Sequence, residues 1–308
     1  MLFQLMDAKI LLLATLIGLT LVYLISWWTT ARQRLAAKGH GSHEPVTPSP
    51  LHLAIGFVTN FFDTLGIGSY AQTTTAYKAW KLVPDQQIPG TLNTGHVLPT
   101  IVQALIFITG VAVEFQTLLF LIAAACAGAW LGAGIVSGFS RRKVQLGMGT
   151  ALMGAALVVL AQLLGIVPAG EALALTGTKL AIGVIVNFML GALMTLGVGL
   201  YAPCMVLISL LGMNPLAAFP IMMGSCAFLM PVAAIQFVRR NAYNLRAALG
   251  LALGGPLAVL LAYWLIGSLP TRLVRVLVLI VISYTSFTML RSAAIERKAA
   301  GRAMTQMG

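Results

Sequence analysis

Charged side chains are scarce in this sequence. They make up only 8% of its 308 residues, whereas hydrophobic residues make up 59% and the mean hydropathy is +0.94. A soluble domain carries roughly 25% charged residues, so a chain of this composition could not cover its surface against water. The scarcity of charge therefore excludes a soluble globular protein and indicates an all-α protein that crosses a membrane several times.

Acidic residues and cysteines are also few. The chain has 7 Asp and Glu against 19 Lys and Arg, and its basic residues form short clusters between apolar runs, which is typical of membrane-protein loops rather than of a nucleic-acid surface. The three cysteines (Cys126, Cys204 and Cys226) lie in apolar stretches, which excludes a disulfide scaffold. The histidines and carboxylates are too dispersed for a catalytic or metal-binding cluster. The sequence thus predicts neither an enzyme nor a cofactor or metal.

Seven apolar stretches approach or exceed the roughly 20 residues needed to cross a bilayer. They cover residues 8–28, 91–111, 115–138, 144–166, 216–238, 246–267 and 271–290. The first ends in Trp27-Trp28 without a small-residue cleavage site, so it is predicted to be an anchor helix rather than a signal peptide. A polar linker then extends to residue 50.

Two further apolar segments, 51–80 and 178–211, are broken by glycines near their middle, in TLGIGSY (64–70) and TLGVGLY (195–201). Each is too long for one crossing and too short for two. If each returns to the side from which it enters, all but four of the 19 Lys and Arg face the cytoplasm, as the positive-inside rule requires. We therefore expect seven full spans, two re-entrant or short helical hairpins, an outside N-terminus and a cytoplasmic C-terminus.

The two broken segments belong to an internal repeat. LAIGFVTNFF (53–62) matches LAIGVIVNFM (180–189), which places Asn60 opposite Asn187, and the two glycine motifs align after a short insertion. Because each copy has one hairpin and three spans, an odd number, the second copy is expected to be inverted. Inverted repeats with interrupted helices are typical of transporters.

The repeat divides the chain into four predicted parts. These are an anchor and linker (1–50), repeat 1 (51–165), repeat 2 (178–290) and a basic cytoplasmic tail (291–308).

The helix breaks are the predicted binding site. Glycines let a ligand approach the backbone, and the helix that follows a break directs N–H groups toward it, an arrangement suited to an anion. The candidate residues of the first copy are Asn60, Thr64, Gly66, Gly68, Ser69, Tyr70, Gln72, Thr73, Asn93, Thr94 and His96, and those of the second copy are Asn187, Thr195, Gly197, Gly199, Tyr201, Cys204, Gly224, Ser225 and Cys226. Small-residue helix packing is the alternative explanation for these clusters.

Two ionisable residues lie beside the first break. Ionisable groups inside a membrane are candidates for function. Asp63 could carry a proton, or it could cap the helix that follows it. His96 could bind or protonate an anion, or it could satisfy a backbone carbonyl.

The repeated order of a glycine-broken hairpin, a proline and a small-residue cluster resembles the sulfite exporter TauE/SafE family over residues 51–290. This resemblance implies passage of sulfite, sulfoacetate, thiosulfate or a similar anion across a bacterial inner membrane. The sequence departs from the family pattern in its sparser glycines and in the NTGH cluster at 93–96.

Export is the favoured direction, because a negative cell interior expels an anion with about 2.3 kcal/mol per charge at 100 mV. A permease for a carboxylate or a cation and a non-transporting scaffold or assembly factor are the alternatives. The oligomeric state is not specified by the sequence.

Overall fold

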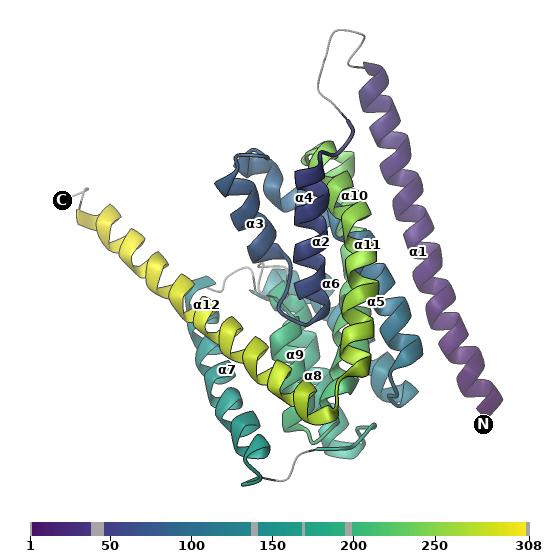
Figure 1. The fold of residues 1–308 in the computed structure, drawn as a ribbon, viewed down its shortest axis with the longest axis vertical. Helices are drawn as coiled ribbons and strands as arrows, with labels where there is room; N and C mark the ends of the chain where they lie inside the picture. Colours follow the sequence, from purple (N-terminus) through teal and green to yellow (C-terminus); the bar gives the residue numbers. More distant parts are fainter. Residues whose placement is uncertain (1, 38–45, 137–140, 168–169, 195–198, 306–308) are drawn as a thin grey trace. The chain divides into compact units, whose positions relative to one another are not determined.

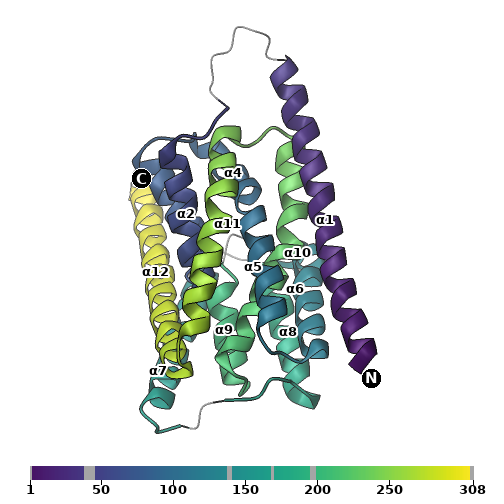
Figure 2. The ribbon, with the colours of Figure 1, turned by 45° about the vertical axis from the view of Figure 1, so that its right-hand side comes forward.

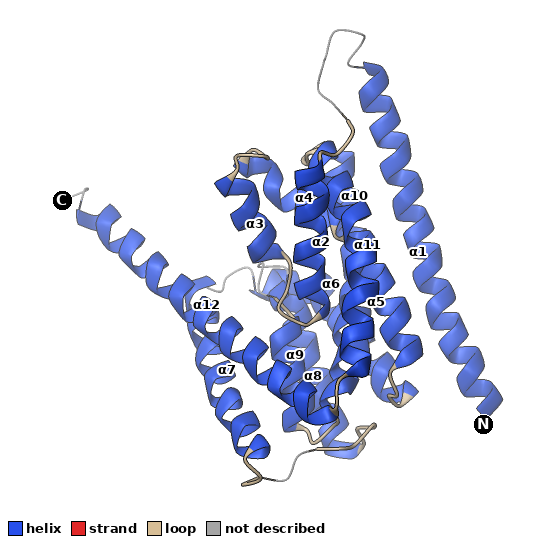
Figure 3. Cartoon of the chain, in the orientation of Figure 1, coloured by secondary structure: helices blue, strands red, loops and turns tan. Residues whose placement is uncertain are grey.

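The computed structural model describes residues 2–37, 46–136, 141–167, 170–194 and 199–305. In these residues the secondary structure is helical, apart from one isolated β-bridge between Ala172 and Met213 (Figure 3). The elements are α1 (Leu2–Ala37), α2 (Pro50–Thr64), α3 (Tyr70–Ala79), η1 (Asp85–Gln87), α4 (Ile88–Gly95), α5 (Val97–Gly110), α6 (Phe115–Val136), α7 (Arg141–Leu163), α8 (Gly177–Met194), α9 (Tyr201–Leu210), η2 (Pro215–Ala217), α10 (Ala218–Arg239), α11 (Leu245–Ser268) and α12 (Thr271–Thr305). The all-α prediction is confirmed.

Seven helical segments of the described chain are long and apolar enough to cross a membrane. They are Lys9–Ala36, Asp85–Gly110, Arg142–Leu163, Gly177–Met194, Pro215–Arg239, Leu245–Ser268 and Arg272–Ile295. The set differs from the predicted one, because Gly177–Met194 was expected to be only one arm of a hairpin. The helix α6 (Phe115–Val136) has 22 residues, which is long enough for the span predicted at 115–138.

Large apolar side chains are exposed along these helices. Trp130, Leu257 and Trp264 are 84%, 65% and 69% exposed. Soluble monomers rarely expose so much contiguous apolar surface, whereas lipid chains accept it. The exposed side chains therefore agree with a multi-pass membrane protein in contact with a bilayer.

The helices pack into two compact units. Unit 1 contains Met1–Gly110 and Met223–Ser268, and unit 2 contains Val111–Met222 and Leu269–Gly308. Each unit combines helices from both predicted repeats, so packing follows a different division from the sequence duplication. The boundaries of the repeats and the orientation of the chain in the membrane stay predictions.

In unit 1, α2 lies along α11 (Figures 1 and 2). A Cβ on Gly250 would clash with His52, and a Cβ on Gly254 would clash with the Leu53 carbonyl. The glycines thus allow the two helix backbones to approach closely, as small residues commonly do in membrane proteins.

The helix α3 returns beside α2 toward the end at which α2 begins (Figure 1). The Tyr77 hydroxyl, near the end of α3, donates to the Ala247 carbonyl at 3.2 Å. Ile55 of α2 and Tyr77 lie in one buried apolar cluster with Leu251. The segment 50–79 is therefore a helical hairpin, with α2 and α3 as its arms and the break between them at its tip.

In unit 2, α8 lies along α6 in a similar way. A Cβ on Gly191 would fall on the Ala125 carbonyl, and a Cβ on Gly128 would fall on that of Phe188. The helix α9 also returns toward the beginning of α8, because Leu211 at its end lies beside Gly183. Each hairpin thus packs on a helix from the other predicted repeat.

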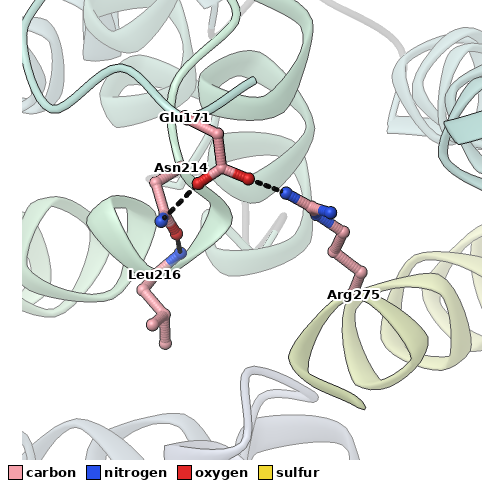
Figure 4. A network of polar contacts seen from close by, with 4 residues as sticks. All are labelled: Glu171, Asn214, Leu216 and Arg275. Atoms are coloured by element: carbon pink, nitrogen blue, oxygen red, sulfur yellow. Dashed lines mark hydrogen bonds and ion pairs between the residues drawn. The ribbon is translucent and has the colours of Figure 1, made fainter. Parts of the chain in front are cut away.

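The segment before α8 is joined to two other parts of unit 2. Ala172 donates its N–H to the Gly212 carbonyl at 3.3 Å and accepts that of Asn214 at 2.8 Å. Glu171 accepts a hydrogen bond from the Asn214 side chain at 3.3 Å and forms an ion pair with Arg275 of α12 (Figure 4). These contacts connect the turn after α9 to the first turns of α12.

The helix α3 ends at a residue with left-handed backbone. Lys81 has φ 51°, and the Leu82 N–H closes the turn on the Tyr77 carbonyl at 3.0 Å. This is a Schellman-type cap, whose left-handed position favours glycine. The same position after α9 is occupied by Gly212, with φ 86°.

Replacing Lys81 by glycine is therefore expected to stabilise the protein. A residue with a side chain pays roughly 1–2 kcal/mol for this conformation, and glycine avoids that cost. Glycine also makes the unfolded chain more flexible, which lowers the stability of the folded protein by about 0.4–1 kcal/mol. Thermal unfolding in detergent should show a midpoint higher by roughly 2 °C. Lys81→Ala, which removes the same side chain without relieving φ, should show no such gain, and an equal rise in both variants would contradict the explanation.

The helix α6 begins with a carboxylate cap. The Glu114 carboxylate accepts the backbone N–H groups of Gln116 at 2.8 Å and Thr117 at 2.6 Å. Burial raises the pKa of Glu114, but these hydrogen bonds to the ionised form outweigh it, so that the pKa lies below its ordinary value. The folded protein therefore favours the ionised carboxylate.

This cap predicts a specific dependence of stability on pH. The cap contributes fully to the free energy of unfolding above the ordinary pKa of a glutamate, about 4.3. The contribution is lost as the pH falls through the lower pKa that Glu114 has in the folded protein. Between about pH 5.5 and pH 3.5, the unfolding temperature of the wild type should fall more than that of Glu114→Gln, whose side chain does not titrate. Parallel curves for the two proteins would show that the cap contributes nothing.

Candidate functional site

The first helix break lies where the glycine motif predicted it. The helix α2 ends at Thr64 and α3 begins at Tyr70. Between them, Gly66 and Gly68 have φ of 94° and 87°, a region that side chains rarely adopt. The glycines therefore allow the chain to turn within a few residues and start the return helix.

Three polar side chains of α2 point from one face of the helix at this break. Asn60, Asp63 and Thr64 are spaced by three and four residues, which places them on one helical face. All three are buried. Because buried polar groups need hydrogen-bond partners, the elements packed against this face have to supply them.

His96, between α4 and α5, is the partner of Asn60. Its Nδ1 lies 2.9 Å from Asn60 Oδ1, and its Nε2 lies 3.1 Å from Thr73 Oγ1 on α3. The Thr73 hydroxyl, which has one hydrogen to donate, also lies 2.9 Å from the Ser69 carbonyl. The Tyr70 ring stacks on the imidazole with a centroid separation of 5.7 Å. His96 thus connects both arms of the first hairpin.

Asp63 is surrounded by hydrogen-bond donors. Gln103 Nε2 donates to Asp63 Oδ2 at 3.0 Å and also to Thr64 Oγ1 at 2.9 Å. Ser69 donates both its hydroxyl and its backbone N–H to the Asp63 carboxylate. None of the ion pairs between described residues includes Asp63. Ser69 occupies the N-cap position of α3. Asp63 therefore contacts the residue at the N-cap and is not itself that residue.

These contacts form one continuous set, which we name the tip network. It consists of Asn60, Asp63, Thr64, Ser69, Tyr70, Thr73, His96 and Gln103. All members except Tyr70, which is partly buried, are buried. The structure therefore brings together seven residues that the sequence nominated and one that it did not.

Gln103 was missed because it lies within an apolar span. The signal that could have found it is the spacing of His96, Thr100 and Gln103, which are four and three residues apart and so share a face of the helix. All three are buried. Polar residues at helical spacing within a membrane span indicate a site more strongly than any one of them alone.

The other candidates of the first copy lie around the tip network. Tyr70 donates its hydroxyl to Asn93 Oδ1 at 3.2 Å, and Gln72 donates to the Gly68 carbonyl at 3.1 Å. Cys226 of α10 is buried and close enough to Tyr70 to interact with it electrostatically. Gly224 and Ser225 precede it in α10 and are buried. Cys226, a candidate of the second copy, therefore lies near the first hairpin tip.

The helix α1 contacts the same region. The buried Tyr23 hydroxyl donates to the Thr94 carbonyl at 2.8 Å, and Trp27 Nε1 donates to the Tyr243 hydroxyl at 3.1 Å. The predicted anchor is therefore also packed against the turn that carries His96. Sequence alone gave no sign of this, because Tyr23 and Trp27 resemble ordinary interfacial aromatics.

The other described candidates of the second copy belong to unit 2. Asn187 is buried and donates to the Leu121 carbonyl at 2.6 Å. Tyr201 and Cys204 are buried at the beginning of α9, which Gly199 precedes. Thr195 and Gly197 lie outside the described residues. A single cage built from both hairpins therefore stays a prediction.

An open hollow of about 440 Å³ lies at the other end of α3, lined by Tyr77, Lys78, Lys81, Val83, Pro84 and Asp85. Lys78 and Asp85 form an ion pair at 3.6 Å there, with both side chains more than half exposed. An exposed ion pair of this kind stabilises a protein by at most about 1 kcal/mol.

Comparison with known proteins adds no assignment. No protein-family model matches the chain, and no curated protein or solved structure matches it either.

Proposed function

We propose that the protein is a secondary transporter that moves a small sulfur-containing oxyanion, such as sulfite, thiosulfate or sulfoacetate, across a bacterial inner membrane, with export as the favoured direction. The observation that carries this proposal is the buried tip network at a glycine-made helix break. Polar side chains and interrupted backbone are expensive in a membrane and are retained where they line a site or a path.

The pairing of the hairpins supports transport over a purely structural role. Both hairpins pack on a neighbouring long helix through glycines, Gly250 and Gly254 in unit 1 and Gly128 and Gly191 in unit 2. Repeated helix breaks are typical of transporters that work by alternating access around a bound solute. A scaffold has no need of two such breaks.

The chemistry of the first break supports a small, hydrogen-bonding solute. The network offers hydroxyl, amide and imidazole groups, together with the N-terminal N–H groups of α3. Oxyanions accept hydrogen bonds from such groups. The choice of sulfur oxyanions among them rests on the resemblance of residues 51–290 to the sulfite exporter TauE/SafE family.

Ligand-dependent stabilisation of the purified protein tests the solute class. A ligand that binds the folded protein at 100 times its Kd stabilises it by about 2.7 kcal/mol. We expect thiosulfate, sulfite and sulfoacetate to raise the unfolding temperature, and acetate, succinate and sodium or potassium chloride at matched ionic strength to leave it unchanged. Stabilisation by a carboxylate or a cation alone would replace the proposed substrate. A folded protein that no solute stabilises but that retains a co-purifying partner would favour a scaffold.

A further inference from the structure

The tip network contains one fixed acidic group and no basic partner for it. Asp63 takes part in no ion pair among the described residues, and three donors, Gln103 Nε2 and both groups of Ser69, are directed at its carboxylate. Burial opposes the charge and these hydrogen bonds favour it. The network carries one negative charge when Asp63 is ionised and His96 is neutral.

The hydrogen bonds define the state of His96. Asn60 Nδ2 donates to the Gly56 carbonyl at 2.7 Å, so its Oδ1 is the atom that faces His96 Nδ1. Nδ1 must then carry a hydrogen, and in the neutral imidazole Nε2 is an acceptor. The Thr73 hydroxyl, 3.1 Å away, is the donor that Nε2 needs.

The same arrangement accommodates a second proton on His96. If Nε2 is protonated, it donates to Thr73 Oγ1, and the Thr73 hydroxyl turns to donate to the Ser69 carbonyl at 2.9 Å. The Tyr70 ring stacked on the imidazole favours a cation further. Rotation of one hydroxyl therefore satisfies both protonation states without moving a helix.

An anion that binds here alone would add a second uncompensated negative charge in a buried site. Isolated buried charges are strongly disfavoured. A proton taken up together with the anion avoids this penalty. On the basis of the proposed function, we infer that the tip network binds its anion together with a proton, which adds to Nε2 of His96 from water on one side and returns to water on the other.

The titratable groups around His96 come from several elements. They are Asp63 on α2, Tyr70 on α3, Cys226 on α10 near Tyr70, and Tyr23 on α1, which reaches the Thr94 carbonyl. The helix α5 contributes the amide Gln103, and α11 packs on Gly95 through Leu251 and Ala248. Both protonation states of His96 find hydrogen-bond partners in this set.

The coupling makes the driving force depend on the charge of the substrate. A dianion with one proton moves one net negative charge, so a negative interior still favours its exit. A monoanion with one proton moves no net charge. We therefore expect thiosulfate flux to respond to both potential and pH gradient, and methanesulfonate flux to respond to the pH gradient only.

Calorimetry of the purified protein provides the test. Thiosulfate is titrated near pH 7 in two buffers of different ionisation enthalpy, and the difference in heat gives the number of protons taken up. The wild type should take up one proton per anion. His96→Gln should take up none and bind thiosulfate about 10-fold or more weakly. His52→Gln, which replaces a histidine paired with Ser49 outside the network, should behave as the wild type.

The outcomes separate this inference from the proposed function. Thiosulfate binding by the wild type without proton uptake, or proton uptake that persists in His96→Gln, would overturn the coupling and leave the transporter proposal standing. Absence of binding for thiosulfate, sulfite and methanesulfonate by a folded wild type would overturn the proposed substrate, and the coupling with it.

Discussion

Replacing Gly191 by valine should prevent normal packing of α8 on α6. A Cβ at this position would coincide with the Ala125 carbonyl oxygen, and backbone cannot move aside as a flexible side chain can. The two helices would have to separate along their whole contact. We expect a loss of about 3 kcal/mol or more, at the upper end of the cost of overpacking, seen as poor yield and an unfolding temperature lower by roughly 10 °C.

Gly154 in α7 provides the matched control for Gly191. Nothing lies within 4 Å of a Cβ built on it, so Gly154→Val introduces the same side chain into open space. Its unfolding temperature should stay close to that of the wild type. If Gly191→Val were as stable as Gly154→Val, the close approach of α6 and α8 would be wrong.

Replacing Gly66 by valine should abolish transport while most of the fold is retained. Gly66 has φ 94°, and its N–H donates to the Asp63 carbonyl at 2.8 Å. A β-branched residue is strongly disfavoured at this φ, so the turn must shift and carry Asp63 and Thr64 with it. Displacement of binding groups by about 1 Å lowers rates by roughly 100-fold, and we expect flux in proteoliposomes to fall by about that factor.

Gly18→Val in α1 is the control for Gly66→Val, because a Cβ there meets nothing within 4 Å. Its flux should equal that of the wild type. By the repeat, Gly197→Val is expected to have the same effect as Gly66→Val. Unchanged transport in folded Gly66→Val and Gly197→Val proteins would mean that the helix breaks do not form the substrate path.

Local features of the fold were predictable from sequence because they have local causes. Apolar length and the scarcity of charge gave the helical membrane class, and glycines in TLGIGSY gave the position of the first break. Asn60, Thr73 and His96 were nominated because polar groups are rare in such a chain. Each of these inferences depends on one segment at a time.

Packing between distant segments could not be predicted in the same way. The contact of α2 with α11 depends on where Gly250 and Gly254 lie opposite His52 and Leu53, which no single segment encodes. The Tyr23 contact with Thr94 has the same origin, since it joins residues that are 71 positions apart. The helix α8 was expected to be one arm of a hairpin, and its 18 apolar residues also make it long enough to be a candidate span.

Flux of thiosulfate and sulfite from proteoliposomes, with imposed potential and pH gradients, is the most direct test of the proposed transport. We expect saturable efflux that is faster when the compartment containing the anion is electrically negative, that responds to pH, and that Gly66→Val reduces roughly 100-fold. The same vesicles should retain acetate. If the folded wild type moved no sulfur oxyanion under any gradient, the tip network would not be a transport site for this class of substrate.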